Sequence, residues 1–301
     1  MSPWPRDRPV CQPSIMLTSN GYVLDEDARR LGELEAVPER ERNDRDALRE
    51  RLRKTGYLYL RGALDRDEVL AFRRYYFRQL ESTGLTRPGT DPAQGVAGGD
   101  VDLAKLRHIL FREIVPGPVY HAFCTQPAVR KWYEWFLDGP TYLHRRKIIR
   151  HLRPRETGIG TATQAHYDLL YLRGGTDAVL TSWIPLGDCP LTRAPLIYLE
   201  GSHHRMRAEE ERAARTGAPR RPAASITADL PKLAAEHDAR WLVTDYRAGD
   251  MVVHSAYLVH ASLDNVDPDG IIRLSTDIRY QRADDTIDLR WQNHWRYDDG
   301  L

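Results

Sequence analysis

The chain has 301 residues, and its 44 basic residues are nearly balanced by 43 acidic ones. This balance gives no global field that favours nucleic acid or a membrane surface, so we expect a small-molecule substrate, no nucleic acid, no membrane and no obligate protein partner. A chain of this length can bury ~75% of its unfolded surface, so its core needs no covalent staples.

The three cysteines, Cys11, Cys124 and Cys189, are far apart and form no Cys-x-x-Cys pair. Their spacing argues against a disulfide framework and against a zinc site built on thiolates. The first residues lack the apolar core of a signal peptide, and the sequence contains no run of about 18 apolar residues. These features predict a cytoplasmic protein.

The first 140 residues are predicted to be mainly helical. Residues 1–25 are rich in proline and are expected to form an N-terminal arm. Charged segments with apolar residues at helical spacing predict helices over 26–37, 44–55, 65–82, 101–113 and 126–137, with a short strand at Tyr57–Leu60. Residues 84–100 form a long Gly- and Pro-containing loop, for which the sequence leaves open a lid and a flexible surface loop.

From Thr141 the pattern changes to short apolar or alternating runs bounded by Gly, Pro and Asp. The predicted strands cover 142–152, 164–172, 178–186, 195–199, 251–260 and 270–281. Many short strands at fairly regular spacing favour an antiparallel sandwich or barrel over a parallel sheet. Polar sequence at 203–240 interrupts the pattern, with a predicted helix at 228–238.

Candidate metal ligands lie in two of these runs. His166 and Asp168 are two residues apart, so on a strand their side chains point to one face; a hydrogen-bonded surface pair is the alternative. The downstream run offers His254 and His260. Two His and one carboxylate can hold one face of iron(II) and leave the other positions open for a co-substrate and oxygen. A lone His-x-Asp triplet is unspecific, and the surrounding motifs give it weight.

Taken together, these motifs resemble a known family. The order His166-x-Asp168, Trp183, Gly201-Ser202-His203, Gly249-Asp250, His260-x-Ser262, Asn265 and Arg273 is similar to that of the phytanoyl-CoA dioxygenase family of iron(II)/2-oxoglutarate oxygenases. The resemblance spans roughly residues 50–295. One departure is Glu200, where the family often has Pro before Gly-Ser-His.

The resemblance implies a mostly β fold with flanking α-helices, built on a double-stranded β-helix, the cupin-like jelly roll. We therefore expect one oxygenase domain over 1–301. Its parts are the arm at 1–25, a helical support at 26–140 that contains loop 84–100, and a jelly-roll core at 141–295. The insertion at 203–240 is expected near the mouth of the barrel, where it covers substrate.

The resemblance also implies the site residues. His166, Asp168 and His260 are the expected metal ligands, which leaves His254 in the core or beside the site. Arg273 is the expected anchor for the far carboxylate of 2-oxoglutarate, since arginine offers a planar fork, and Arg279 is the fallback. The other expected co-substrate contacts are Ser262, Trp183 and Gln164; a core position is the alternative for Trp183, and a surface role is the alternative for Gln164. Asn265 is expected to fix a turn, and His203 and His204 to be structural.

The implied cofactors are Fe(II), the co-substrate 2-oxoglutarate and O2. The implied reaction oxidises a C–H bond of a small molecule, by hydroxylation or oxidative cyclisation, and releases succinate and CO2; the triad does not separate these outcomes from desaturation or epimerisation. The substrate is expected to be a sugar, an aminocyclitol or another secondary metabolite. A fatty acyl-CoA hydroxylase, a non-catalytic metal-binding jelly roll and a hydrolytic or isomerising metal enzyme remain as alternatives. The presence of Asp168 argues against halogenation, because related halogenases lack this ligand.

Overall fold

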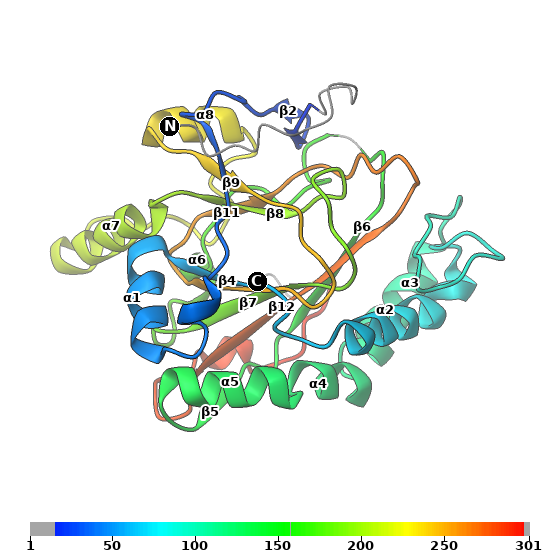
Figure 1. The fold of residues 1–301 in the computed structure, drawn as a ribbon, viewed down its shortest axis with the longest axis horizontal. Coiled ribbons are helices and arrows are strands. Elements are labelled where there is room, and N and C mark those ends of the chain that lie inside the picture. The colour runs from blue at the N-terminus through cyan, green and yellow to red at the C-terminus, as the bar shows by residue number, and fades with distance from the viewer. Residues whose placement is uncertain (1–15, 157, 298–301) are drawn as a thin grey trace.

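The computed structural model describes residues 16–156 and 158–297 and shows two facing β-sheets flanked by helices (Figure 1). The larger sheet has the strand order β4-β10-β7-β12-β5, and β6 pairs with β12 next to β5. Its strands are β4 (Tyr57–Leu60), β5 (Thr141–Leu143), β6 (Ile148–Leu152), β7 (Leu180–Pro185), β10 (Met251–Ser255) and β12 (Arg273–Arg282). All of these pairings are antiparallel.

The smaller sheet covers one face of the larger one. Its order is β11-β8-β9-β3, with β3 (Leu31–Glu33), β8 (Leu196–Leu199), β9 (Trp241–Val243) and β11 (His260–Ser262). A short hairpin of β1 (Thr18–Ser19) and β2 (Tyr22–Val23) contacts this layer, because the Ser19 hydroxyl donates to the carbonyl of Ser262. The two layers are those of the predicted jelly roll, whose interior holds the site.

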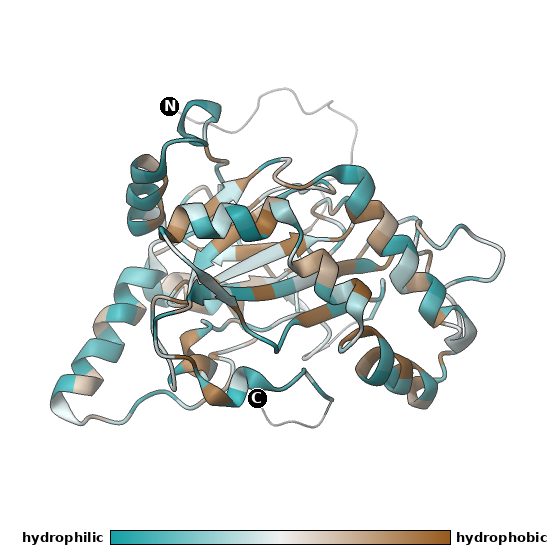
Figure 2. Ribbon diagram, turned by 90° about the horizontal axis from the view of Figure 1, so that it is seen from below, coloured by the Kyte–Doolittle hydropathy of each residue, from teal (hydrophilic) through white to brown (hydrophobic). Residues whose placement is uncertain are grey.

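Helices cover the outer face of the larger sheet (Figure 1). They are α1 (Arg45–Thr55), α2 (Arg66–Leu80), α3 (Leu103–Ile109), the π-helix η3 (Leu110–Ile114), α4 (Pro118–Cys124) and α5 (Pro127–Leu137). Figure 2 shows that these helices carry both hydrophobic and hydrophilic residues, as expected for helices with one buried side. The remaining helices are α6 (Leu169–Leu172), α7 (Ser202–Thr216), α8 (Leu230–His237) and the short 3-10 turns η1 (Glu39–Glu41), η2 (Glu81–Thr83) and η4 (Leu289–Gln292).

Local sequence explains the limits of several elements. The carboxylate of Asp44 accepts hydrogen bonds from the first-turn amides of α1, and Asp65 does the same for α2. Helix α1 ends at Gly56, whose φ of 82° suits glycine, and β4 follows at once. A Cβ at Gly56 would lie 2.8 Å from the ring of His203, which places that histidine in a structural contact.

Strand β12 shows the predicted alternation of side chains. Leu274, Ile278 and Tyr280 pack with the outer helices, whereas Arg273, Asp277 and Arg279 face the barrel interior. The polar face of this strand is therefore enclosed by the two sheets. This placement rules out the simpler interpretation of that face as solvated surface.

Some predicted elements were wrong. Residues 26–37 hold β3 and turns in place of a helix, because Leu31–Glu33 pairs in parallel with β9, more than 200 residues away. The run 164–172 contains an isolated bridge at His166 followed by α6, and the run 251–260 is divided between β10 and β11 in different sheets. Helix α7 lies where only an irregular insertion was expected.

Loop 84–100 is fastened to the barrel near its end. The amide of Ala97 donates to the carbonyl of Gly270, and the amide of Ile272 donates to the carbonyl of Gly95. The buried guanidinium of Arg73 also donates to the carbonyls of Ala93 and Gln94. The loop therefore approaches the start of β12, and whether it acts as a lid stays a prediction.

Two further expectations concern the cysteines and membranes. Cys124 and Cys189 are buried free thiols, and Cys11 lies outside the described residues, as do residues 1–15 of the predicted arm. Within 16–156 and 158–297, no helix has both the length and the apolar character needed to cross a bilayer.

Asp250 holds the turn between the sheets, and its removal should destabilise the fold. Its buried carboxylate accepts from the hydroxyl of Tyr59 at 2.8 Å and from the amides of Gly62 and Arg247, each at 2.9 Å. Asp250→Ala leaves these donors unpaired, so we expect the free energy of unfolding to fall by about 3 kcal/mol. Urea unfolding measures this, with the exposed Asp269→Ala as the control; equal losses in both variants would contradict it.

Candidate active site

The three predicted metal ligands converge inside the barrel. His166 precedes α6, Asp168 is the residue at the start of α6, and His260 begins β11. The backbones of His166 and His260 exchange two hydrogen bonds, of 3.1 and 2.9 Å. One potential ligand atom from each of the three residues lies within 4.8 Å of the others. The arrangement is the 2-His-1-carboxylate set typical of non-haem iron oxygenases.

The backbone at Asp168 differs from the predicted strand. Its φ and ψ of −63° and −32° are helical, so His166 and Asp168 do not sit on one continuous strand. The chain instead turns into α6, and the amide of Leu169 donates to the carbonyl of Ala256. The two side chains meet because of this turn, and the alternation of a strand plays no part.

Both imidazoles are oriented for metal binding. Nδ1 of His166 lies 2.9 Å from the carbonyl of Gln164, and Nδ1 of His260 lies 3.0 Å from that of Leu258. A carbonyl only accepts, so Nδ1 carries the proton and Nε2 presents its lone pair. Burial lowers the pKa of both imidazoles, which favours the neutral form that a metal requires.

Asp168 is held in its ionised form. Burial by itself would raise the pKa of this carboxyl group, but the guanidinium of Arg279 and the neighbouring histidines hold it well below its usual range. Arg279 Nη2 donates to Asp168 Oδ1 at 2.8 Å, and the hydroxyl of Thr181 donates to Oδ2. Asp168 is therefore an oriented anion before any metal arrives.

His254, the alternative third ligand, lies beside the group. It is fully buried in β10, and its Nε2 is 3.5 Å from Asp168 Oδ2. The hydroxyl of Tyr198 is 3.3 Å from its Nδ1. In the described part of the chain, the set of residues able to hold a metal contains His260 and does not contain His254.

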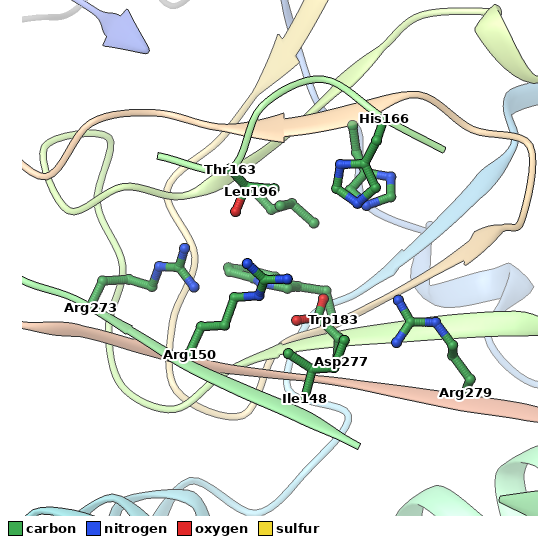
Figure 3. Close-up of a pocket in the computed structure, with 10 residues that line it drawn as sticks. Ile148, Arg150, Thr163, His166, Trp183, Leu196, Arg273, Asp277 and Arg279 are labelled. Carbon is green, nitrogen blue, oxygen red and sulfur yellow. The ribbon is translucent and has the colours of Figure 1, made fainter. Parts of the chain in front are cut away.

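Two cavities that share several lining residues lie beside the triad. The inner one is the smaller; it is shown in Figure 3 and is lined by Ile148, Arg150, Thr163, His166, Trp183, Leu196, His260, Arg273, Asp277 and Arg279. The outer one, of about 250 Å³, adds Ala162, Gln164, Asp168, Tyr171, Ser225 and Trp291.

Arg273 provides an unsatisfied cation at one end of the inner cavity. It is only 2% exposed, and its Nε and Nη2 have no hydrogen-bond partner, while Nη1 donates to the hydroxyl of Ser275. Burial lowers its pKa to about 10, so the group still carries its charge at neutral pH. A buried fork with free N–H groups fits the far carboxylate of a 2-oxo diacid, and the triad fits the metal that such an acid chelates.

The other predicted co-substrate residues have different settings. Trp183 lines the inner cavity and packs edge-on against Tyr246, with ring centroids 4.8 Å apart. Gln164 lines the outer cavity and orients His166 through its carbonyl. The hydroxyl of Ser262 accepts from the amide of Thr163 at 2.8 Å, and Ser262 is not among the lining residues of either cavity. Their contacts with a co-substrate stay predictions.

Asn265 acts as expected for a turn residue, because its Nδ2 donates to the carbonyls of Leu152 and Ile271. Nε2 of His203 lies 3.1 Å from the carbonyl of Arg53, away from the triad.

The sequence reading missed Arg150 and gave no role to Ser275 and Asp277. Ser275 and Asp277 share the inner face of β12 with Arg273, and the alternation of that strand was a sufficient signal for them. Arg150 lies on β6 opposite Ser275, a pairing between segments more than 100 residues apart. No local pattern indicates that register.

A third cavity adjoins Arg150 and is lined by a half-buried histidine, His151. The lining residues include Leu110, Arg150, His151, Thr163 and Trp295. Nδ1 of His151 lies 2.6 Å from the hydroxyl of Tyr76. Burial lowers the pKa of His151 to about 4, with smaller contributions from nearby arginines. The folded protein therefore keeps this imidazole neutral in mild acid.

His151 should make the fold acid-sensitive. A histidine in the unfolded chain has a pKa near 6.5, whereas the pKa of His151 in the folded protein is about 4. Between these pH values the unfolded state binds a proton and the folded state does not, so the free energy of unfolding falls as the pH falls. Between pH 7 and pH 5 we expect His151→Gln to lose about 2 kcal/mol less unfolding free energy than the parent protein. Urea unfolding at both pH values measures this, with exposed His204→Gln as control. Equal losses in the parent and His151→Gln would contradict it.

Comparisons with known proteins agree with this geometry. The chain is 28% identical over 253 residues to the 1-deoxypentalenic acid 11-beta-hydroxylase of Streptomyces arenae, covering 80% of this chain and 82% of the relative. The fold is similar to the carbocyclase SnoK from nogalamycin biosynthesis, described as non-heme and alpha ketoglutarate dependent (TM-score 0.56, 21% identity, 89% of this chain and 92% of that one). It is also similar to the epimerase SnoN in complex with Fe3+, alpha ketoglutarate and nogalamycin RO (TM-score 0.55, 22% identity, 81% and 85%).

The family comparison covers most of the chain. The model of the phytanoyl-CoA dioxygenase family matches residues 52–273, a span that contains His166, Asp168, His260 and Arg273. The chain therefore belongs to the phytanoyl-CoA dioxygenase family, a family of oxidoreductases.

Proposed function

We propose that this protein is an Fe(II)- and 2-oxoglutarate-dependent dioxygenase that oxidises a C–H bond of a small secondary metabolite. The observation that carries the proposal is the convergence of the triad with one buried arginine, Arg273, in a single cavity. The overall change is balanced: substrate C–H, 2-oxoglutarate and O2 give substrate C–OH, succinate and CO2. Oxidative cyclisation is the second outcome that the same site supports.

Each protein group has a defined part in this function. His166, Asp168 and His260 hold the iron, which with O2 and 2-oxoglutarate supplies the oxidising power. Arg273 binds the far carboxylate of 2-oxoglutarate, with Trp183, Ser262 and Gln164 as the further predicted contacts. Arg279 and Thr181 fix the orientation of Asp168, and the carbonyls of Gln164 and Leu258 fix the two imidazoles.

The choice of a secondary metabolite rests on the curated relatives, which are named for hydroxylation of 1-deoxypentalenic acid. The size of the outer cavity supports a compact substrate, and Ser225 of the insertion 203–240 reaches its wall, which supports a covering role for that insertion. A sugar or aminocyclitol remains within this class. A fatty acyl-CoA is the alternative substrate from the same family, and turnover of an acyl-CoA with no metabolite turned over would replace our proposal.

The test is an anaerobic titration of the iron(II)-loaded protein with 2-oxoglutarate. We expect the visible charge-transfer band of a chelated iron–keto acid complex, followed in air by slow succinate formation without added substrate. If saturating iron and co-substrate give neither band nor succinate, the protein is a metal-binding jelly roll without oxygenase activity. A band with succinate directs the work to substrate screening.

A further inference from the structure

Arg150 occupies the junction of the cavities around the candidate active site. Its side chain lines the inner cavity, the outer cavity and the third cavity beside His151. Figure 3 shows its guanidinium rising between Arg273 and Trp183 into the space below His166. A molecule bound in the outer cavity beside His166 and Asp168 therefore lies in a space that this cation also lines.

Among the three arginines of this site, Arg150 and Arg273 have no carboxylate partner in the described part of the chain. Arg279 is paired with Asp168, and Arg273 is buried and bonded to Ser275. For Arg150, which is exposed to the cavities, no carboxylate within 4.0 Å is found among the described residues. A guanidinium at a cavity wall that has no carboxylate partner can bind an anion from outside the protein through charge-assisted hydrogen bonds.

The charges around the cavities leave room for one more negative charge. The charged side chains that line the inner and outer cavities are three arginines, at 150, 273 and 279, and two aspartates, at 168 and 277. Iron(II) and the dianion of 2-oxoglutarate cancel each other. One positive charge therefore remains when metal and co-substrate are bound, and a monoanionic substrate neutralises it.

Arg273 and Arg150 occupy different positions, which suit the binding of the co-substrate and of the substrate, respectively. Arg273 is 2% exposed and lines only the inner cavity, which suits a co-substrate that is enclosed before the substrate binds. On β6, Leu152 pairs with Arg273, and Arg150 pairs with Ser275 of β12. Arg150 therefore lies two residues further along the same face of the barrel than Arg273. It also faces the outer cavity, where the substrate enters.

On the basis of the proposed function, we propose that the substrate is an organic acid whose carboxylate is bound by Arg150. The apolar residues that line the outer cavity, Ile148, Ala162, Tyr171 and Trp291, receive the apolar body of that acid. The carboxylate then fixes which carbon of the substrate faces the metal. Arg150 is in this sense a specificity-determining residue, and it takes no part in the bond-breaking step.

The test compares carboxylates with their neutral isosteres. Benzoate, cyclohexanecarboxylate and adamantane-1-carboxylate, each beside its primary amide, are titrated calorimetrically into the anaerobic protein loaded with iron(II) and 2-oxoglutarate. We expect at least one acid to bind about ten-fold or more tightly than its amide, as for a charge-assisted hydrogen bond. Arg150→Met should lower the affinity of that acid about ten- to a hundred-fold, to the level of the amide, and leave the affinity for 2-oxoglutarate unchanged.

Arg145→Met is the matched control, because Arg145 is an exposed arginine on the same segment and lines none of the three cavities. It should keep the preference for the acid, and thermal melting checks that both variants fold. Equal affinities for acid and amide in all three pairs, or no binding of any acid, overturn the proposal. A loss of 2-oxoglutarate affinity in Arg150→Met overturns it too and assigns Arg150 to the co-substrate. If the parent protein itself fails to bind 2-oxoglutarate, the failure is that of the proposed function.

Discussion

His166→Ala and His260→Ala should each weaken iron(II) binding by at least about 100-fold, while His254→Ala should weaken it less. The first two variants remove one of the three converging ligands, whereas His254 stands outside that group and contacts Asp168 from the side. Loss of an outer partner of a metal ligand typically weakens metal binding about 10- to 100-fold, so we expect a loss of at least about 100-fold for a ligand itself. Calorimetric titration with iron(II) and the 2-oxoglutarate charge-transfer band provide two independent measurements.

The comparison with His254→Ala makes this prediction specific to the assignment of the third ligand. All three histidines are largely buried, so a general effect of removing an interior side chain appears in every variant. If His254→Ala loses the band and His260→Ala keeps it, the ligand set is wrong. Thermal melting of the metal-free variants shows whether each has kept the fold, which separates loss of a ligand from loss of structure.

The choice between these two histidines shows what the sequence could and could not predict. His254 and His260 lie in one apolar run, and periodicity alone does not distinguish them. In the structure the residues between them carry the chain from β10 in the larger sheet to β11 in the smaller one. Only His260 then pairs with His166. The resemblance to the family also indicated His260, because the family places its second histidine ligand just before a serine and an asparagine, here Ser262 and Asn265.

Local signals predicted elements well where a cap or an alternation sets the limits. Gly56 marked the end of α1, and the alternation of β12 correctly separated Arg273 and Asp277 from Leu274 and Ile278. The signals failed where a distant partner decides the conformation. Residues 31–33 pair with β9, and this pairing overrides their helical spacing. Arg150 was not predicted for the same reason, since its position at the cavities depends on the register of β6 against β12.

Asp168 is a case in which a correct residue was found by an incomplete argument. The His-x-Asp spacing was read as two side chains on one face of a strand, yet Asp168 begins a helix. The spacing is equally compatible with a turn, and only the contact between Leu169 and Ala256 shows which is present. The chemical argument about ligand types was therefore more robust than the geometric one about strands.

Arg273→Met should weaken 2-oxoglutarate binding by about 30- to 1,000-fold, and Arg273→Lys should fall between that variant and the parent. Removing one partner from a buried, hydrogen-bonded charge pair costs about 2–4 kcal/mol, because the far carboxylate then lies in an enclosed site without its cation. Lysine keeps the charge and loses the planar fork. The measurement is the 2-oxoglutarate concentration at half-saturation of the charge-transfer band.

Arg279→Met is the informative comparison for this second prediction, since Arg279 was the alternative anchor. Its Nη2 is bonded to Asp168, while its Nε and Nη1 have no hydrogen-bond partner and its guanidinium lies 4.6 Å from the centre of the Trp291 ring. We expect Arg279→Met to weaken iron(II) binding through Asp168, with 2-oxoglutarate affinity nearly unchanged once iron is saturating. A larger loss of 2-oxoglutarate affinity in Arg279→Met than in Arg273→Met would exchange the two roles. Both arginines are buried on the same face of β12. If only Arg273→Met weakens 2-oxoglutarate binding, the co-substrate requires a cation at that position, and a second buried cation elsewhere in the barrel does not replace it.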